Sequence, residues 1–212
     1  MKRAIIFMLF IVAIVICHYY VDRGATLYIY KSQLHEYFVL GVISDYIISF
    51  LSAVIFLVYF YGLIQFLVMG YSKVNKKILH IANSIVITIY LKDLLKYIFA
   101  RTRPTTFTNN NLSLISHNVY RFDWFHDGKA YASFPSGHAA FIFAFATSLW
   151  FIYPKWRWLG VVLAIILVLS QLAMSYHYIS DLIAGAGFGI WVSYFYLKQY
   201  NLMPTKNKLT TK

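Results

Sequence analysis

The feature that most constrains this chain is a long uncharged run: no Asp, Glu, Lys, Arg or His occurs between Tyr46 and Ser72. A helix needs about 20 mostly apolar residues to cross the hydrocarbon core of a bilayer, so this run predicts a transmembrane helix. Five other stretches are long and apolar enough to do the same. The predicted spans cover residues 4–21, 46–70, 78–97, 136–153, 158–176 and 180–198, and residues 26–39 predict a short helix at the membrane interface.

Composition agrees with a membrane protein. Of the 212 residues, 60% are hydrophobic and 12% are charged, whereas a soluble domain is about 45–50% apolar and about 25% charged. The single cysteine excludes an intrachain disulfide framework, and no alternation typical of strands stands out. We therefore expect an all-α, polytopic bundle of six transmembrane helices, with residues 1–212 as one membrane-embedded domain. For the first run, an uncleaved helix is favoured over a signal peptide, because no small-residue cleavage site follows it.

The net charge of +12 does not predict nucleic-acid binding, because the basic residues fall in short clusters beside apolar runs. Cytoplasmic loops are enriched in Lys and Arg. A cytoplasmic N-terminus puts most basic clusters on that side, among them Lys2 and Arg3, Lys76 and Lys77, and Lys155 and Arg157. The long loop at 100–135 is then expected on the extracytoplasmic face.

Three polar segments are predicted at this outer face. In the first, Lys96 and Arg103 precede Pro104. If the third span lasts to Arg103, these two cations share a helix face. Arg offers an anion a planar fork, and Lys offers it a point charge. Snorkelling of both side chains to the interface is the alternative without a function.

The second segment runs from Pro135 to His138, at the predicted start of the fourth span. Free N–H groups and the dipole at a helix N-terminus favour phosphate. Gly137 would admit a phosphate close to the backbone, and Ser136 adds a hydroxyl donor. His138, in the first turn, could give a proton to a leaving oxygen. A plain helix cap is the alternative.

The third segment, from Ser175 to Asp181, joins the fifth and sixth predicted spans. His177 and Asp181 lie either on one helix face or opposite each other across a tight corner. A carboxylate that holds one imidazole nitrogen leaves the other available as nucleophile or base. An interfacial polar pair is the alternative, and no third ligand with metal-site spacing accompanies the two.

In order along the chain, these segments resemble the three signatures of the type 2 phosphatidic acid phosphatase (PAP2) superfamily. Lys96 to Pro104 resembles KxxxxxxRP, Pro135 to His138 resembles PSGH, and Ser170 to Asp181 resembles part of SRxxxxxHxxxD. The motif-bearing core is therefore 96–181, and residues 1–95 carry no motif.

The resemblance implies a lipid phosphatase that uses neither a metal nor a cofactor. His177 would attack phosphorus and become a transient phosphohistidine, with Asp181 orienting and charging it. His138 would protonate the leaving group and then activate water. The phosphoryl oxygens would be held by Lys96, Arg103, Ser136 and the backbone of Gly137.

Gln171 departs from the third signature, which has Arg at this position. Gln keeps a hydrogen-bond donor but loses a positive charge, so Gln171 is expected at the phosphate site only as a weaker contact. Three explanations stay open. Arg101 or another outer base compensates, turnover is reduced, or the substrate phosphate is held differently.

The substrates that the resemblance implies are undecaprenyl diphosphate, a lipid A phosphate, phosphatidylglycerophosphate and phosphatidic acid. Aromatic and basic residues in the 100–135 loop, such as Tyr120, Arg121 and Trp124, suit a lid over a lipid phosphate. Two rival functions are a non-catalytic or weakened superfamily member and a membrane transporter or channel. A transporter predicts charged residues near the bilayer midplane, whereas the charges here gather at the ends of the predicted spans.

Overall fold

A computed structural model of the protein describes residues 2–70, 75–106 and 110–203. These residues form helices, turns and loops, with isolated β-bridges but no strand, so the all-α prediction is confirmed. The main helices are α1 (Lys2–Ile16), α2 (Asp22–Lys31), α3 (Phe38–Met69), α4 (Lys76–Phe99), α5 (Leu114–His117), α6 (Gly137–Ile152), α7 (Arg157–Ala173) and α8 (Ile179–Gln199). A π-helical turn, Cys17–Val21, joins α1 to α2, and short 3-10 turns lie at Leu34–Glu36, Lys129–Tyr131 and Pro154–Trp156.

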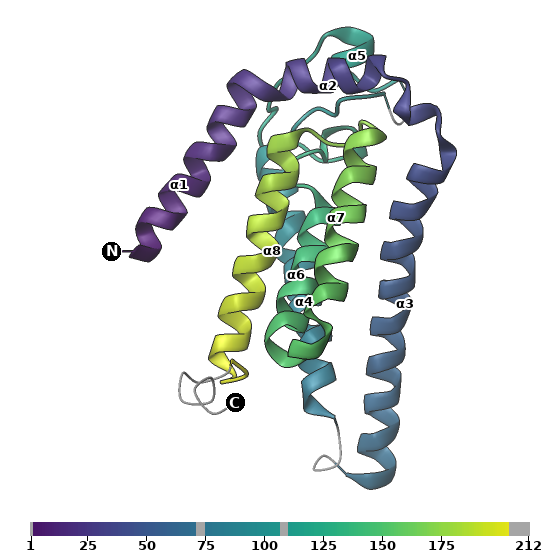
Figure 1. Ribbon diagram of the computed structural model, residues 1–212, viewed down its shortest axis with the longest axis vertical. Coiled ribbons are helices and arrows are strands. Elements are labelled where there is room, and N and C mark those ends of the chain that lie inside the picture. Colours follow the sequence, from purple (N-terminus) through teal and green to yellow (C-terminus); the bar gives the residue numbers. More distant parts are fainter. Residues whose placement is uncertain (1, 71–74, 107–109, 204–212) are drawn as a thin grey trace.

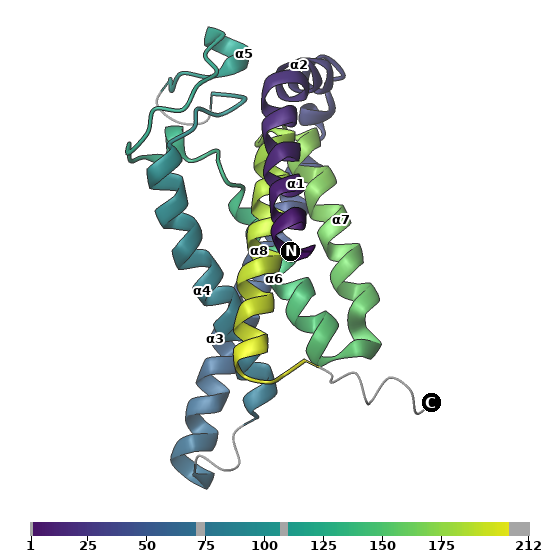
Figure 2. The same ribbon diagram turned by 90° about the vertical axis from the view of Figure 1, so that its left-hand side faces the viewer.

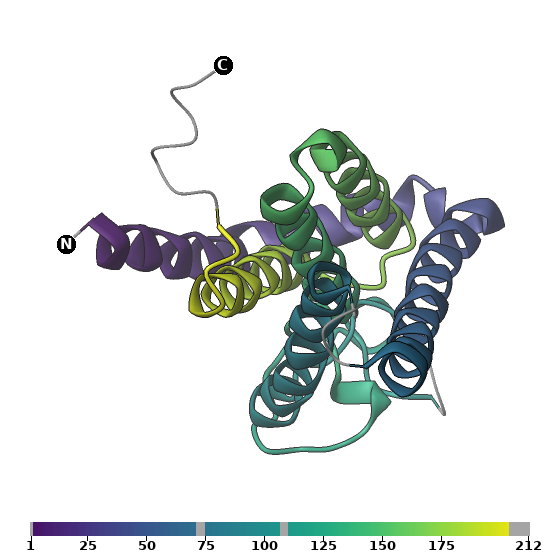
Figure 3. The same ribbon diagram turned by 90° about the horizontal axis from the view of Figure 1, so that it is seen from below.

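Helix α6 is the centre of the bundle, packed between α4, α7 and α8, while α3 stands at the edge (Figure 3). The contact between α6 and α8 is close because α8 presents glycine to it. A Cβ at Gly185 would collide with the carbonyl oxygen of Ser136, and a Cβ at Gly189 would collide with that of Ala140. Small residues let helix backbones approach in this way in membrane proteins.

Several helices are suited to a bilayer. Within the described residues, four are long and apolar enough to span one: Ala4–Lys31, Val39–Met69, Lys76–Phe99 and Pro154–Ala173. Gly137–Ile152 is apolar but shorter. Large hydrophobic side chains are exposed along α1 and α3, among them Met8, Phe50 and Phe56, as expected of surfaces that face lipid. The protein is a multi-pass membrane protein, and the full count of six spans stays a prediction.

The N-terminal helices differ from the sequence prediction. The first span was expected to end at residue 21 and an interfacial helix to begin at 26, but helix continues through both positions to Lys31. Helix α2 then lies across one end of the bundle (Figure 1). The reason is the polar side chain that begins α2: Asp22 is fully buried and paired with Arg101, so the helix need not break where the apolar run stops.

The end of the third span also differs. Helix α4 ends at Phe99 and not near Arg103, because Ala100 adopts a left-handed conformation with φ of 42°. The chain after it is extended, and Arg101 and Arg103 form isolated bridges to Phe122, Ala132 and Ser113. The condition under which Lys96 and Arg103 would share a helix face, a span that lasts to Arg103, is therefore not met.

The three motif segments nevertheless meet. The C-terminal ends of α4 and α7 and the N-terminal ends of α6 and α8 lie at one end of the bundle, the end that also carries α2 and α5 (Figures 1 and 2). The end of α3, the start of α4 and the end of α8 lie at the other. Which side of the membrane each end faces stays a prediction.

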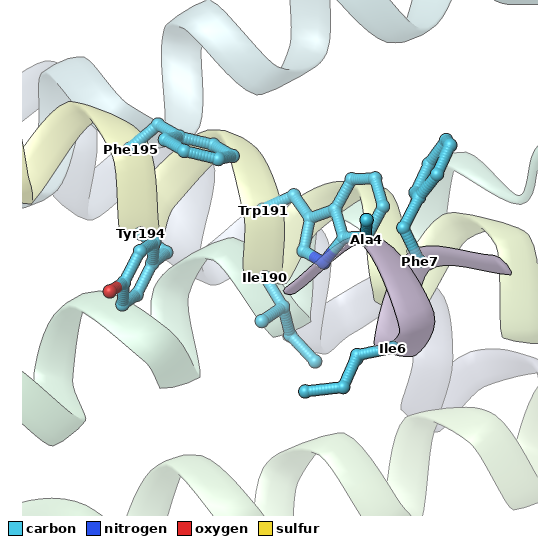
Figure 4. A pocket seen from close by; sticks show the side chains of 7 residues that line it. All are labelled: Ala4, Ile6, Phe7, Ile190, Trp191, Tyr194 and Phe195. Carbon is cyan, nitrogen blue, oxygen red and sulfur yellow. The ribbon is translucent and has the colours of Figure 1, made fainter. Parts of the chain in front are cut away.

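An apolar groove of about 540 Å³ separates the start of α1 from the second half of α8. Figure 4 shows Phe7 of α1 beside Trp191 of α8, with Tyr194 and Phe195 further along the same helix. Among the residues that the structure describes, no charged side chain lines this groove. The polar chemistry is gathered elsewhere, at the end of the bundle where the motif segments meet.

Candidate active site

A polar cavity of about 360 Å³ opens at that end of the bundle. The predicted site residues that the structure brings to its wall are Lys96, Arg103, His138, Gln171 and His177. Its other lining residues are Asp45, Asp93, Lys129, Ala132 and Tyr176.

Two cations reach the cavity from different backbone settings. Lys96, in the last turn of α4, donates from Nζ to the carbonyl oxygen of Ala132 at 2.6 Å. Arg103, in the extended segment after α4, donates from Nε to the carbonyl oxygen of Lys129 at 2.8 Å. The segment 129–132 thus positions both side chains, and Lys129 itself adds a third positive charge to the wall. Such a cluster favours an anion of the size of a phosphate.

His177 lies in the corner between α7 and α8, and only 4% of its surface is exposed. Its Nδ1 is 3.6 Å from Oδ2 of Asp181, which lies in the first turn of α8. Burial lowers the pKa of His177 to about 3, although Asp181 opposes this shift. The imidazole is therefore neutral near pH 7, the state in which a ring nitrogen can act as nucleophile.

Asp181 is completely buried and held from several sides. Oδ1 accepts from Arg101 Nη1 at 2.5 Å. Oδ2 accepts from Ser133 Oγ at 2.6 Å and from the backbone N–H of Tyr178 at 3.0 Å. These donors fix the carboxylate on the Nδ1 side of His177. Nε2 is therefore the ring nitrogen left to react with a ligand in the cavity.

His138 lies in the first turn of α6 and faces an acid that the sequence did not suggest. Its Nε2 is 3.7 Å from Oδ1 of Asp45 on α3, whose side chain is 64% exposed. The only sequence signal for Asp45 was its place directly before the uncharged run that begins at Tyr46.

Ser136 and Gly137 lie at the start of α6 but not on the wall of the cavity. Ser136 is fully buried and caps α6, with its Oγ accepting from the backbone N–H of Ala139 at 3.4 Å. A Cβ at Gly137 would lie 3.2 Å from Cδ of Lys92 and 3.7 Å from Cε of Lys96, so the glycine leaves room for these side chains. Neither residue is on the cavity wall, and their direct contact with phosphate stays a prediction.

Gln171 is fully buried in the last turn of α7 and lines the cavity. Arg101, one of the bases considered as a substitute for the missing arginine, does not take that place. Its guanidinium lies behind Asp181, where it also binds Asp22. Lys129 is the additional base that the structure brings to the cavity.

The buried cluster around Arg101 was missed by sequence reasoning. Arg101 Nη2 lies 2.9 Å from Nδ1 of His18 and donates to the Tyr120 hydroxyl at 2.6 Å. The signal that could have found the cluster is Asp22, an acid at the end of an apolar run.

The 100–135 loop forms one side of the site, since Lys129 and Ala132 line the cavity. Its aromatic residues pack onto the end of α4: the ring of Phe99 lies 5.3 Å from that of Trp124 and 4.9 Å from that of Phe134. Residues 107–109 of the loop are outside the described residues. A lid function for this loop stays a prediction.

The fold and the cavity define an integral membrane protein with a cationic, histidine-bearing site at one end of its helix bundle. Residues 77–203 match the PAP2 superfamily, and the chain belongs to that superfamily.

Curated relatives agree with this assignment. A lipid A 1-phosphatase of Rhizobium johnstonii is 33% identical over 110 residues, which is 52% of this chain and 42% of that protein. An undecaprenyl-diphosphatase of Sulfolobus acidocaldarius is 32% identical over 124 residues, 58% of this chain and 55% of that protein. The chain thus spans about half the length of the curated relatives it matches.

One solved structure has a similar fold. It is the crystal structure of a transmembrane PAP2-type phosphatidylglycerolphosphate phosphatase from Bacillus subtilis, with a TM-score of 0.55 and 16% identity. The similarity covers 97% of this chain and 98% of that one. At this identity the comparison concerns the fold alone.

Proposed function

We propose that the protein is a phosphatase that removes a terminal phosphate from a membrane lipid. The observation that carries this proposal is the meeting of Lys96, Arg103, His138 and His177 at one cavity, from segments far apart in the sequence. Two cations suit a phosphate, and two histidines suit a nucleophile and an acid–base group.

In the proposed reaction, Nε2 of His177 attacks phosphorus and the bond from phosphorus to the lipid oxygen breaks. His138 gives its proton to that oxygen, so that a lipid with one phosphate fewer departs. His138 then takes a proton from water, which attacks the phosphohistidine and releases inorganic phosphate and the free imidazole. Phosphoryl transfer depends mainly on positioning and charge stabilisation, which this cavity is suited to provide.

The surroundings of each group fit its role. Lys96 and Arg103 would neutralise the equatorial oxygens in the transition state. Asp181 would stabilise the positive charge that His177 acquires on phosphorylation. Lys129 would supply the charge that Gln171 lacks, and the backbone of Gly137 with the hydroxyl of Ser136 would complete the phosphate site.

The substrate class follows from the place of the cavity. It opens at the end of apolar helices, where the headgroup of a lipid would present its phosphate. Trp124 and Phe125, in the 100–135 loop that forms one side of the site, are exposed. The names of the relatives favour a lipid A phosphate and undecaprenyl diphosphate, with phosphatidylglycerophosphate and phosphatidic acid as further candidates. We place the cavity on the outer side of a bacterial inner membrane.

The test is phosphate release by the purified protein from these four lipids in detergent micelles, with and without excess chelator. Release from at least one lipid, unaffected by chelator and absent in His177→Ala, is expected. Release that is lost with chelator and restored by Mg²⁺ or Zn²⁺ would contradict the phosphohistidine mechanism. No release from any lipid would favour a non-catalytic member of the superfamily.

A further inference from the structure

We propose that Asp22, which lies outside the family-matched region 77–203, is a positioning residue for the nucleophile. It acts on His177 through Arg101 and Asp181. This inference rests on the proposed phosphatase function.

The three charged side chains form a continuous buried row. Oδ2 of Asp22 is 2.9 Å from Nη2 of Arg101, and Nη1 of Arg101 is 2.5 Å from Oδ1 of Asp181. All three side chains have no exposed surface. One cation is therefore shared between two carboxylates, and the second of these faces His177.

Asp22 also binds the helix start that carries Asp181. Its Oδ1 accepts from the backbone N–H of Ser180 at 2.9 Å, and its Oδ2 accepts from the Ser180 hydroxyl. The first N–H groups of a helix have no partner within the helix, and a carboxylate at that end is stabilising. The N-terminal helix thus supplies the anionic cap of α8 and fixes the corner in which His177 lies.

Aromatic rings prevent Arg101 from turning away from this row. Its guanidinium carbon is 4.2 Å from the ring centre of Tyr178, 4.8 Å from that of Tyr120 and 5.1 Å from that of Phe122. The Tyr120 hydroxyl accepts from Arg101 and donates to Asp22. Because the guanidinium is held in place, its attraction is divided between Asp22 and Asp181.

This division has a consequence for the reaction. Without the charge of Asp22, Asp181 would be the only carboxylate that balances the charge of Arg101. Asp181 would then stabilise the imidazole of His177 less as that ring becomes positively charged. Phosphoenzyme formation should then slow. Binding of the phosphate should change little, because Lys96 and Arg103 are positioned by the carbonyl oxygens of Ala132 and Lys129.

The test compares Asp22→Asn with the parent protein, using short-chain phosphatidic acid as substrate and vanadate as phosphate analogue. Asp22→Asn leaves the neutral Arg101–Asp181 pair, so we expect it to fold. We expect kcat to fall about 10–100-fold, the range for groups that orient a directly acting residue. KM and vanadate inhibition should stay within about threefold of the parent. Asp22→Glu, which keeps the charge, should retain more of kcat than Asp22→Asn.

Two control variants separate the effect of the Asp22 charge on kcat from a general loosening of the N-terminal helices. Glu36→Gln removes one negative charge from an exposed position before α3, and should leave kcat unchanged. Phe10→Ala removes a ring that packs against Trp191 and Gly187. It should lower the melting temperature by loosening α1 without lowering kcat.

The outcomes distinguish the two proposals. A parent that releases phosphate while Asp22→Asn keeps its kcat would overturn this inference and leave the phosphatase function standing. An equal fall of kcat in Phe10→Ala, or a lower kcat in Asp22→Glu than in Asp22→Asn, would also overturn it. No release by the parent from any of the four lipids would overturn the phosphatase function, and this inference with it.

Discussion

The imidazole of His138 lies 3.7 Å from the carboxylate of Asp45, and both side chains line the cavity. His177 has a similar partner in Asp181, 3.6 Å away, but the two pairs differ in exposure. Asp181 is completely buried and bound by several donors, whereas the side chain of Asp45 is 64% exposed. A rigid, dry pair suits a nucleophile, and an accessible pair suits a group that exchanges protons with substrate and water.

Asp45→Asn should lower kcat only modestly, because even a charged contact at so exposed a carboxylate contributes only about 0.2–1 kcal/mol. This corresponds to a decrease of about 1.4- to fivefold with a lipid substrate. The decrease should be smaller with p-nitrophenyl phosphate, whose leaving group needs less help from an acid. An equal loss with both substrates would mean that Asp45 does not act through His138.

His177→Ala should abolish formation of an acid-labile phosphoenzyme with every substrate. His138→Ala should still form it when the leaving group is good. With a lipid substrate, loss of the general acid should cost His138→Ala about 10²–10⁴-fold in rate. Rapid quenching with radiolabelled p-nitrophenyl phosphate and with labelled lipid measures both. If His138→Ala loses the same fraction of its rate with good and with poor leaving groups, the two histidines do not have these separate roles.

Arg103→Lys should be severe even though it keeps the charge, since an ammonium group does not reproduce the planar fork. Loss of one hydrogen bond to a charged partner costs about 1.5–3 kcal/mol, or about 10–150-fold in kcat/KM. Arg157→Lys makes the same exchange at the opposite end of the bundle, where Arg157 lies over the ring of Trp150. A similar effect of both changes would show that Arg103 does not bind the phosphate.

Gln171→Arg should tighten inhibition by vanadate about tenfold, which is the effect of one additional hydrogen bond of about 1.5 kcal/mol to an anion. The side chain of Gln171 lines the cavity, so an arginine there would find the anion as its partner. Gln199→Arg adds the same charge at the far end of α8 and serves as control. Unchanged inhibition in a folded Gln171→Arg protein would separate position 171 from the phosphate site.

Stability should fall as the pH falls from about 6.5 towards 3, in part because of His177. An unfolded histidine takes up a proton near pH 6.5, whereas burial lowers the pKa of His177 to about 3. Between these values the unfolded chain binds more protons, so acidification favours unfolding, by up to about 1.4 kcal/mol per pH unit from this group.

Thermal unfolding in detergent between pH 7 and 5 measures this effect. His177→Asn should show a smaller decrease of the melting temperature with acidification than the parent protein. His117→Asn removes an exposed histidine and should keep the parent's slope. If the melting temperature of His177→Asn falls with acidification as steeply as that of the parent, His177 is not the buried neutral group that causes the pH dependence.

The sequence by itself determined the class of the fold and the end of the bundle where the site lies. Apolar runs and helix start and stop signals act over a few turns of helix, and each of the six predicted spans contains a helix. The same local patterns singled out Lys96, Arg103, His138 and His177, which the structure brings to one cavity, and their roles stay predictions. The helix end after Lys96 was misjudged, because the left-handed conformation of Ala100 is not favoured by an alanine side chain.

Only the tertiary structure decided how the charged groups are paired. Asp22 binds Arg101 because α2 crosses the end of the bundle, and Asp45 faces His138 because the start of α3 borders the cavity. No periodicity encodes such contacts, since several acids could have paired with each cation at similar distance along the chain. Burial selects the Asp22–Arg101 pair, because a charge removed from water must find the opposite charge that packing places beside it. The exposed Asp45 faces His138 only because of where α3 packs.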